Sequence, residues 1–142
     1  MNVNQALNEL SAFNIGDDNY MERLYEITDA LEGETDNGAC ADALYSLLER
    51  YPDVDFGSPG PIVHNLERNR FHLDKLPISV QRQPGYLNVW MVNRILNENL
   101  SDEERMRWTH VLAGVVNNPK AADNIKEKAK KYLVFQQAKA SN

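Results

Sequence analysis

One stretch of the chain, residues 86–100, holds more bulky apolar side chains at helical spacing than any other, with the sequence YLNVWMVNRILNENL. At about 100° per residue, these apolar side chains form one wide stripe, and the stripe must be buried. The residues of the stripe are Val89, Met91, Val92, Ile95 and Leu96. The sequence therefore predicts that this stretch is the middle helix of an all-α domain.

The opposite side of the same helix mixes a large aromatic side chain with polar ones, namely Trp90, Asn93, Arg94 and Asn97. In one interpretation Trp90 packs against a second neighbouring helix, as expected of a central helix that is covered on two sides. In the other interpretation Trp90 and Arg94 face a partner, because Trp and Arg are enriched at interface hot spots. The sequence leaves both interpretations open.

The rest of the chain repeats the helical period, with glycines and prolines between the segments and no convincing alternating strand. Besides residues 86–100, the expected helices cover residues 3–13, from the caps at 17–19 to about 32, from 36 or 37 to 51, 59–69, 73–83, 102 to about 117, and from the cap at 118–119 to about 139. Comparable helix pairs recur every roughly 35 to 45 residues, the spacing of HEAT and armadillo units. We therefore expect one all-α domain over residues 1–142, with seven or eight short helices arranged as HEAT- or armadillo-like stacked hairpins or as an irregular bundle.

Two boundary signals and two apolar positions are specific enough to check against a structure. Ser58 is a typical N-cap and Pro59 a typical first helical residue, so a helix should begin at Pro59. The sequence Ser-Asp-Glu-Glu at residues 101–104 is a capping box that should begin another helix. The apolar pattern places Met106 and Phe135 among the inward-facing residues of the last two helices.

Length and cysteine content limit the class of protein. A chain of 142 residues fits a single domain that buries roughly two thirds of its unfolded surface. The one cysteine, Cys40, cannot form an internal disulfide, and the alanines around it indicate a buried packing position. The longest apolar run, residues 111–116, is far shorter than the roughly 20 residues of a membrane span, and the first residues do not resemble a secretory signal. We therefore expect a soluble, cytoplasmic protein with no membrane partner.

Charge is divided unevenly along the chain, although the net charge is only −6. Residues 1–55 hold thirteen acidic against two basic residues, a net charge of −11, and the remainder carries a net charge of +5. A clustered potential steers association with a partner of opposite sign. The acidic residues therefore indicate either a surface for a basic partner or a solvated face that only aids solubility.

Three acidic residues of the second expected helix share one face, because Glu22, Glu26 and Asp29 are spaced i, i+4 and i+7 with only Arg23 nearby. Like charges at this spacing destabilise an isolated helix by a few tenths of a kcal/mol per pair. A sequence that keeps them despite this cost is weakly indicative of a functional surface.

Four aspartates lie outside the expected helices. Asp17 and Asp18 precede the second helix, and Asp53 and Asp55 follow the third. Asp53-x-Asp55 lacks the further ligands and the terminal glutamate of an EF-hand, so it does not predict a calcium site. We expect Asp53 and Asp55 either to cap the segment around Ser58 or to face a partner.

No arrangement of residues predicts catalysis. His64, His72 and His110 are scattered and lack the further ligands of a zinc site, so no metal is expected. The glycines around residue 58 sit among prolines, without the lysine or strand of a phosphate-binding loop, so no nucleotide cofactor is expected. Cys40 and a histidine remain a formal nucleophile pair, although the alanine-rich surroundings of Cys40 favour packing. An enzyme is therefore the last of the functions considered.

The last expected helix carries a basic surface formed by Lys126, Lys128, Lys130 and Lys131. Such a surface is able to contact nucleic acid. However, the chain is acidic overall and these lysines lack interleaved exposed aromatic side chains, so direct nucleic acid binding is not expected.

Two segments in the middle of the chain resemble a known family. Residues 55–64 read DFGSPGPIVH, and residues 83–97 begin with Gln83-Pro84 and end with WMVNRILN. Both are similar to segments of small bacterial all-helical proteins of polymorphic-toxin and contact-dependent growth inhibition systems, which serve as immunity proteins. The resemblance implies a cytoplasmic protein that binds one cognate toxin domain and blocks it. It carries over no contact residues, because its motifs match a turn, a helix start and a core helix.

The charge pattern agrees with that implication. A nuclease toxin presents a basic substrate cleft, and an acidic inhibitor is suited to occupy or cover it, because complementary potentials speed association. The expected partner-binding residues are Asp17, Asp18, Glu22, Glu26 and Asp29, then Asp53 and Asp55, with Trp90 and Arg94 as less favoured central anchors. The spacing of the units also allows an alternative from another class, a helical-repeat scaffold or adaptor within a larger assembly.

Overall fold

The computed structural model describes residues 1–34, 38–68 and 70–140, and this part of the chain forms eight α-helices, two short 3₁₀ helices and no strand. The α-helices are α1 (Val3–Ser11), α2 (Tyr20–Leu31), α3 (Gly38–Arg50), α4 (Pro61–Arg68), α5 (Leu76–Arg82), α6 (Tyr86–Leu96), α7 (Asp102–Val116) and α8 (Asp123–Ala140), and the 3₁₀ helices are η1 (Glu32–Glu34) and η2 (Arg70–Lys75). The expected all-α class is confirmed. Asp36 and Asn37, at the expected start of the third helix, lie outside the described residues. None of the helices in the described ranges is both long and apolar enough to cross a membrane.

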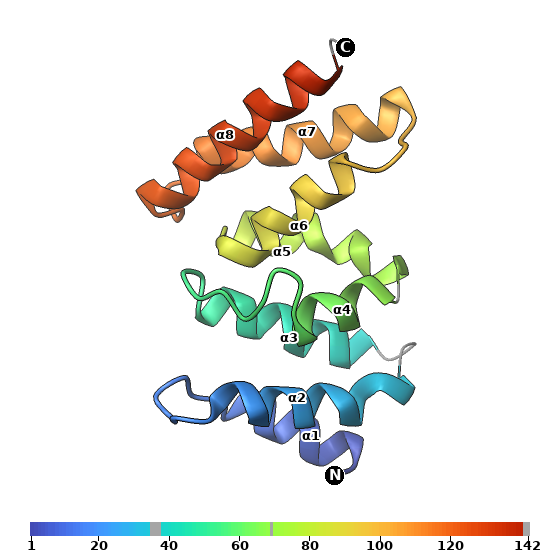
Figure 1. Cartoon of the computed structure of the whole chain (residues 1–142), viewed down its shortest axis with the longest axis vertical. Coiled ribbons are helices and arrows are strands. Elements are labelled where there is room, and N and C mark those ends of the chain that lie inside the picture. Colours follow the sequence, from blue (N-terminus) through green and yellow to red (C-terminus); the bar gives the residue numbers. More distant parts are fainter. Residues whose placement is uncertain (35–37, 69, 141–142) are drawn as a thin grey trace.

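The described helices pair into four hairpins, α1–α2, α3–α4, α5–α6 and α7–α8, which stack along the long axis of the molecule (Figure 1). In one layer α1, α3, α5 and α7 pack against one another in that order. In the other layer, at the front of Figure 1, α2 packs on α4 and α6 packs on α8. The two ends of the chain lie at opposite ends of the stack. The arrangement is therefore a stack of hairpins and not an irregular bundle.

The repeat is less regular than the sequence spacing indicates. The first helices of the four described hairpins begin at residues 3, 38, 76 and 102, so successive starts are 35, 38 and 26 residues apart. The third unit is short because α5 has only 7 residues and three residues join it to α6.

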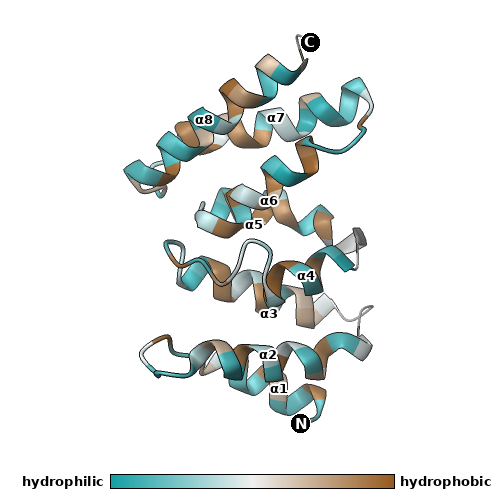
Figure 2. Cartoon of the chain, in the orientation of Figure 1, coloured by the Kyte–Doolittle hydropathy of each residue, from teal (hydrophilic) through white to brown (hydrophobic). Residues whose placement is uncertain are grey.

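The apolar stripe of α6 lies in the core, as predicted. Its five residues are each at most 5% exposed, and Cys40 is buried as expected at 3%. Figure 2 shows apolar segments along the whole length of the stack, and not gathered in one central cluster. Each hairpin therefore depends on its neighbours to bury its apolar side chains.

Ser58 and Pro59 precede the fourth helix and do not begin it. α4 begins at Pro61, and the Ser58–Pro59 peptide bond is cis. The hydroxyl of Ser58 donates to Asp55 Oδ1 at 2.8 Å, so it does not cap a helix. The predicted N-cap is wrong because the segment forms a turn beside the fully buried Phe56, and this burial depends on helices distant in sequence.

The boundaries of the last two helices agree only in part with the prediction. Ser101 caps the start of α7 as predicted, because its Oγ accepts the Glu104 N–H at 3.1 Å while the Glu104 carboxylate accepts the Ser101 hydroxyl at 3.0 Å. α8 begins at Asp123, later than expected. Asn118 does not cap it, because Asn118 Oδ1 accepts the Lys120 N–H at 3.0 Å within a turn.

Met106 and Phe135 are exposed, which contradicts their predicted inward positions. Met106 is 73% exposed and Phe135 is 54% exposed. Both lie on the α7–α8 hairpin at the end of the stack, where no further layer of the described chain covers them. Helical periodicity identifies an apolar face but does not tell whether a neighbour exists to cover it.

A buried polar network joins the second and third hairpins. Asn88 is 1% exposed; its Nδ2 donates to Ser79 Oγ at 3.2 Å, and its Oδ1 accepts the Gly85 N–H at 2.8 Å. The Ser79 hydroxyl donates in turn to Glu49 of α3 at 2.9 Å, and Glu49 binds Arg82 of α5. These contacts fix how α5 and α6 sit on α3.

Candidate functional site

The outward face of α2 is acidic and has one aromatic side chain in its middle. The core side of α2 is buried through Leu24, Ile27, Thr28 and Leu31. The opposite side therefore exposes the four residues that we call the α2 acidic face: Glu22, Tyr25, Glu26 and Asp29. Tyr25 is 51% exposed, so a large aromatic surface is accessible between carboxylates.

The carboxylates of the α2 acidic face are not neutralised by any residue that the structure describes. Glu22, Glu26 and Asp29 form no ion pair with the described part of the chain. Five other acidic residues of segment 1–55 are paired with basic side chains. The pairs are Glu9 and Asp17 with Arg23, Glu32 with Arg68, Asp42 with Lys75, and Glu49 with Arg82. The α2 acidic face thus keeps its full negative charge toward solvent.

Four aromatic rings hold two loops together at one edge of the stack. The buried Phe56, in the loop after α3, makes edge contacts with Phe13, Tyr20 and Tyr51 at centroid distances of 6.4, 6.2 and 6.3 Å. This aromatic cluster brings the loop of residues 12–19 against the loop of residues 51–60, and both lie at the same edge in Figure 1. The cluster therefore places the aspartates of both loops on neighbouring segments.

The four loop aspartates differ in what they contact. Asp17 pairs with Arg23 at 2.6 Å, and Asp55 Oδ1 accepts the Gly57 N–H at 2.8 Å as well as the Ser58 hydroxyl. Asp55 thus takes the expected capping role in its loop. Asp18 and Asp53 are exposed, and neither forms an ion pair within the described residues. These two are the loop aspartates available to a partner.

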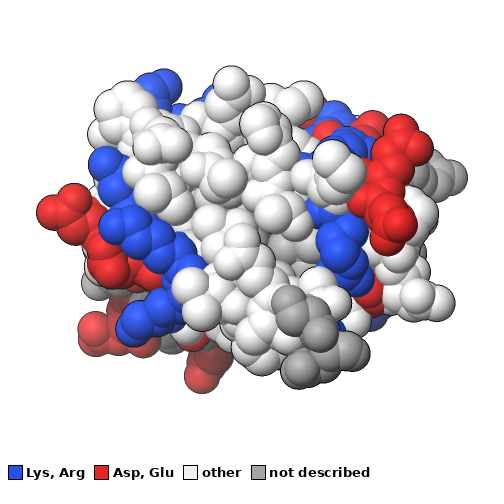
Figure 3. All heavy atoms as spheres, turned by 90° about the horizontal axis from the view of Figure 1, so that it is seen from above, with Lys and Arg blue, Asp and Glu red and all other residues white. Residues whose placement is uncertain are grey.

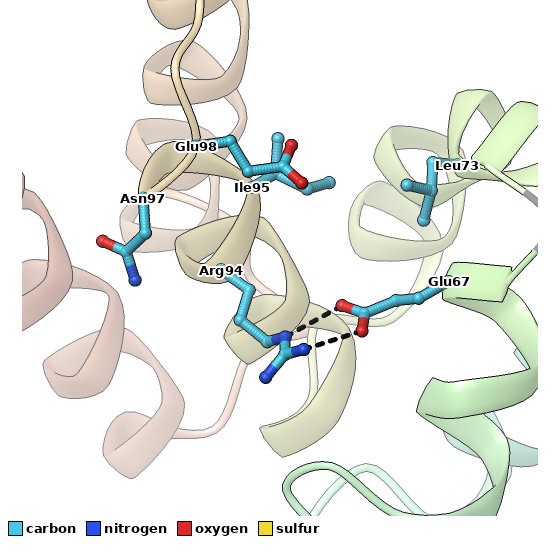
Figure 4. A pocket seen from close by; sticks show the side chains of 6 residues that line it. All are labelled: Glu67, Leu73, Arg94, Ile95, Asn97 and Glu98. Atoms are coloured by element: carbon cyan, nitrogen blue, oxygen red, sulfur yellow. Dashed lines mark hydrogen bonds and ion pairs between the residues drawn. The ribbon is translucent and has the colours of Figure 1, made fainter.

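Trp90 and Arg94 occupy a separate place on α6. The Arg94 guanidinium forms two 2.9 Å hydrogen bonds with the Glu67 carboxylate of α4, as Figure 4 shows, and it lies 5.0 Å from the centre of the Trp90 ring. Trp90 is partly buried against the core. Glu67 and Arg94 border a hollow of about 350 Å³ that Leu73 and Ile95 also line. Arg94 is therefore held by its own chain and is not a free anchor.

The predicted partner-binding residues do not form one continuous site. The α2 acidic face and the two acidic loops lie in the first two hairpins, whereas Trp90 and Arg94 lie in the third. α4 packs on α2 and lies between α2 and α6 in the front layer (Figure 1). A partner that covers the acidic face must therefore extend across α4 to reach Trp90.

The residues weighed for catalysis are dispersed. Cys40 is buried, and His64 is exposed on α4. His110 lines a groove of about 580 Å³ between α5 and α7, together with mainly apolar side chains. The side chain of His72 is not among those described. Within the described residues, no group of three or more His, Cys, Asp or Glu side chains lies close enough to hold a metal ion.

Tyr25 is an exposed aromatic residue of the candidate site that the sequence prediction missed. The sequence could have predicted its position, because Tyr25 follows Glu22 by three residues and precedes Glu26, which puts it on the same helical face. The aromatic cluster had no comparable signal, because Phe13 and Phe56 are separated by more than forty residues in the sequence.

No protein-family model, curated protein or solved structure matches this chain.

Proposed function

We propose that the chain is a non-enzymatic binding protein that docks a basic protein through its acidic N-terminal surface. The α2 acidic face carries this proposal, because its carboxylates are unpaired among the described residues and surround the exposed Tyr25. Complementary potentials raise the association rate and reject partners of the wrong charge. Exposed tyrosine is also a residue type that anchors interfaces.

The partner in this proposal is a bacterial toxin domain, and the chain is its cytoplasmic immunity protein. The similarity of residues 55–64 and 83–97 to immunity proteins supports this step. A toxin with a basic substrate cleft, such as a nuclease, suits the acidic surface. The proposal includes no cofactor, no direct contact with nucleic acid and no contact with a membrane.

The proposal is tested by co-expressing the chain with the product of the adjacent gene and measuring growth protection and association rate. The triple variant Glu22→Lys, Glu26→Lys and Asp29→Lys should slow association by about tenfold or more at low salt and flatten its salt dependence. The substituted side chains are exposed, so circular dichroism should show an unchanged fold.

A matched control reverses three exposed acids at the other end of the stack, namely Glu103, Asp123 and Glu127. The control changes the net charge by the same amount but should leave the association rate with the toxin domain nearly unchanged. Equal rates for the wild type and the α2 triple variant at low salt would contradict the acidic docking surface.

A second function, a scaffold or adaptor in a larger assembly, is favoured by the stacked hairpins, because such stacks present long binding surfaces. The two functions differ in what co-purifies with the chain. A one-to-one complex with a small toxic domain supports the immunity protein, and a stable assembly of several subunits supports the adaptor.

A further inference from the structure

The groove between α5 and α7 is lined mostly by apolar side chains and has a volume of about 580 Å³. Sites for small molecules commonly have volumes of about 300 to 1,000 Å³ and a lining of this kind. The apolar side chains of the lining are Pro77 and Val80 from α5, Val111 and Val115 from α7, and Pro119 from the turn that follows α7. This turn lies across one end of the groove, because Asn118 Nδ2 donates to the Gln81 carbonyl of α5 at 2.9 Å.

Gly114 leaves part of this groove without a side chain. It lies in the last turn of α7 and does not have a positive φ, and a Cβ added there would meet no atom of the described chain within 4 Å. Neither the backbone nor the packing of the described chain therefore requires glycine at this position. Glycine is less favourable in a helix than any residue except proline. The groove is thus open at a position where almost any other residue would give a more stable helix.

The titratable side chains that line the groove are all basic. Lys120 lies at the end formed by the turn, and His110 lies one and a half turns of α7 before the end of that helix. Both residues are exposed, and neither side chain forms an ion pair or a hydrogen bond with the described part of the chain. No Asp or Glu among the described residues lines the groove.

The end face of the stack does not share this uniform charge, because Figure 3 shows both acidic and basic side chains beside the uncharged band there. The groove, in contrast, combines an apolar lining with positive charge alone. Its charge is therefore complementary to an anion.

We propose that this groove binds a small amphipathic carboxylate, that is, a molecule with an apolar ring or short chain and one negative charge. The apolar part lies over Gly114 between Val111 and Val115, and the carboxylate lies at the Lys120 ammonium group. One charged contact at the end of an apolar site fixes the orientation of the ligand.

The length of the groove favours a small molecule over a segment of a partner protein. The part of α7 from His110 to Val116 is only about 9 Å long, and the turn lies across the groove beyond it. α5 and α7 belong to the layer that does not contain α2. The groove and the α2 acidic face are therefore separate, and this proposal does not depend on the binding of a toxin.

The test titrates the isotope-labelled full chain with phenylbutyrate and follows its backbone amide resonances by NMR. Phenylbutyrate should bind with a dissociation constant of about 1 mM or tighter, with the largest shifts at Val111, Gly114 and Val115. The neutral phenylbutyramide should bind about threefold more weakly or worse, because it lacks the charge that pairs with Lys120. Equal binding of the acid and the amide would overturn the recognition of an anion. Shifts spread over the whole surface, without saturation by about 20 mM, would overturn the site.

Two substitutions assign the binding to the groove. Gly114→Leu places a side chain in the open space and should weaken binding of phenylbutyrate by about tenfold or more, while the melting temperature stays the same or rises. Gly33→Leu also adds a side chain where no atom lies within 4 Å, but in η1 beside the first hairpin, and this matched control should bind as the wild type does.

The second substitution removes the charge. Lys120→Ala should weaken binding of phenylbutyrate by about threefold and leave binding of phenylbutyramide unchanged. Lys131→Ala, an exposed change on α8, should alter neither.

Three results would overturn the proposal. The first is a folded Gly114→Leu variant that binds phenylbutyrate as tightly as the wild type does. The second is a Lys120→Ala variant that binds the acid and the amide as the wild type does. The third is a set of groove resonances that shift with protein concentration alone, since these would indicate that a second copy of the chain occupies the groove. Because no toxin is present, these outcomes are independent of the proposed function.

Discussion

Tyr45 of α3 is a buried side chain whose titration is strongly affected by the fold. It is 1% exposed, and burial raises the pKa of its hydroxyl far above the ordinary value of about 10, with smaller contributions from the negative charges of Asp74 and Glu67. The folded protein therefore retains this proton at a pH where the unfolded chain has lost it. Because the folded state then binds more protons than the unfolded state, its stability must fall as the pH rises above about 10.

The first prediction follows from the raised pKa of the Tyr45 hydroxyl. Between about pH 9 and pH 11, the wild type should lose about 1.4 kcal/mol of unfolding free energy that a Tyr45→Phe variant does not lose. Urea denaturation at several pH values measures the difference. Other groups titrate in the same range, so only the difference in slope between the two proteins counts. Parallel slopes would show that Tyr45 ionises as easily in the folded protein as in the unfolded chain.

At the scale of single elements, α2 and α7 differ in how they begin. Ser101 and Glu104 cap α7 reciprocally, whereas the side chain of Asn19, at the cap position of α2, makes no capping hydrogen bond. The N-terminal turn of α2 is held by the aromatic contacts of Tyr20 instead. The polar N-cap residue therefore contributes a side-chain hydrogen bond to the start of α7 and none to the start of α2.

The second prediction compares these caps. Ser101→Ala should lower the unfolding free energy by about 1 kcal/mol, because it leaves the Glu104 N–H without its acceptor. Asn19→Ala should change the unfolding free energy by no more than about 0.5 kcal/mol. Thermal or chemical denaturation of both variants provides the measurement. An equal loss in both would mean that the cap of α7 adds nothing specific.

Sequence patterns predicted a structural feature correctly where that feature depends only on residues close by in the sequence. The apolar stripe from Val89 to Leu96 and the capping box at Ser101 depend only on residues within a few positions, and both are confirmed. Ser58 carried an equally strong local signal, and that prediction was wrong, because the burial of Phe56 against distant helices determines the turn. Likewise, Met106 fits an apolar pattern, but only the end of the stack determines its exposure.

At the scale of the whole molecule, the stacked hairpins contact mainly their neighbours, so stability depends on the links between units. The buried network of Asn88, Ser79 and Glu49 is one such link between the second and third hairpins. A break there separates an N-terminal pair of hairpins from a C-terminal pair. Because the Glu49 carboxylate accepts hydrogen bonds from Ser79 and Arg82 across this link, its removal leaves the buried Ser79 hydroxyl without its acceptor.

The third prediction concerns this link. Glu49→Ala should cost about 1 to 3 kcal/mol and should broaden the urea transition, with a lower m value, because the two halves then unfold less cooperatively. Glu127→Ala, an exposed change within α8, should leave both the midpoint and the m value nearly unchanged. A sharp transition in Glu49→Ala with an unchanged m value would show that the units remain coupled without these contacts.

The candidate surfaces were predictable to different degrees at this scale. The spacing of Glu22, Glu26 and Asp29 predicted one acidic face, and the structure exposes all three. The sequence did not predict that Arg94 pairs with a residue of its own chain. The pairing joins Arg94 of α6 to Glu67 of α4, so it depends on how these two helices lie in the fold. The groove between α5 and α7 was also missed, since amphipathic patterns do not tell which helices lie side by side with space between them.

The aromatic cluster has a consequence for how such a protein can change over generations. Its rings fix the two loops from within, while Asp18 and Asp53 point to solvent and stabilise nothing in the described chain. Replacements at these two positions should change the charge of the loops at almost no cost to folding. If the proposed docking function holds, a lineage whose partner changes can follow it by single amino-acid substitutions in these loops while the fold stays the same.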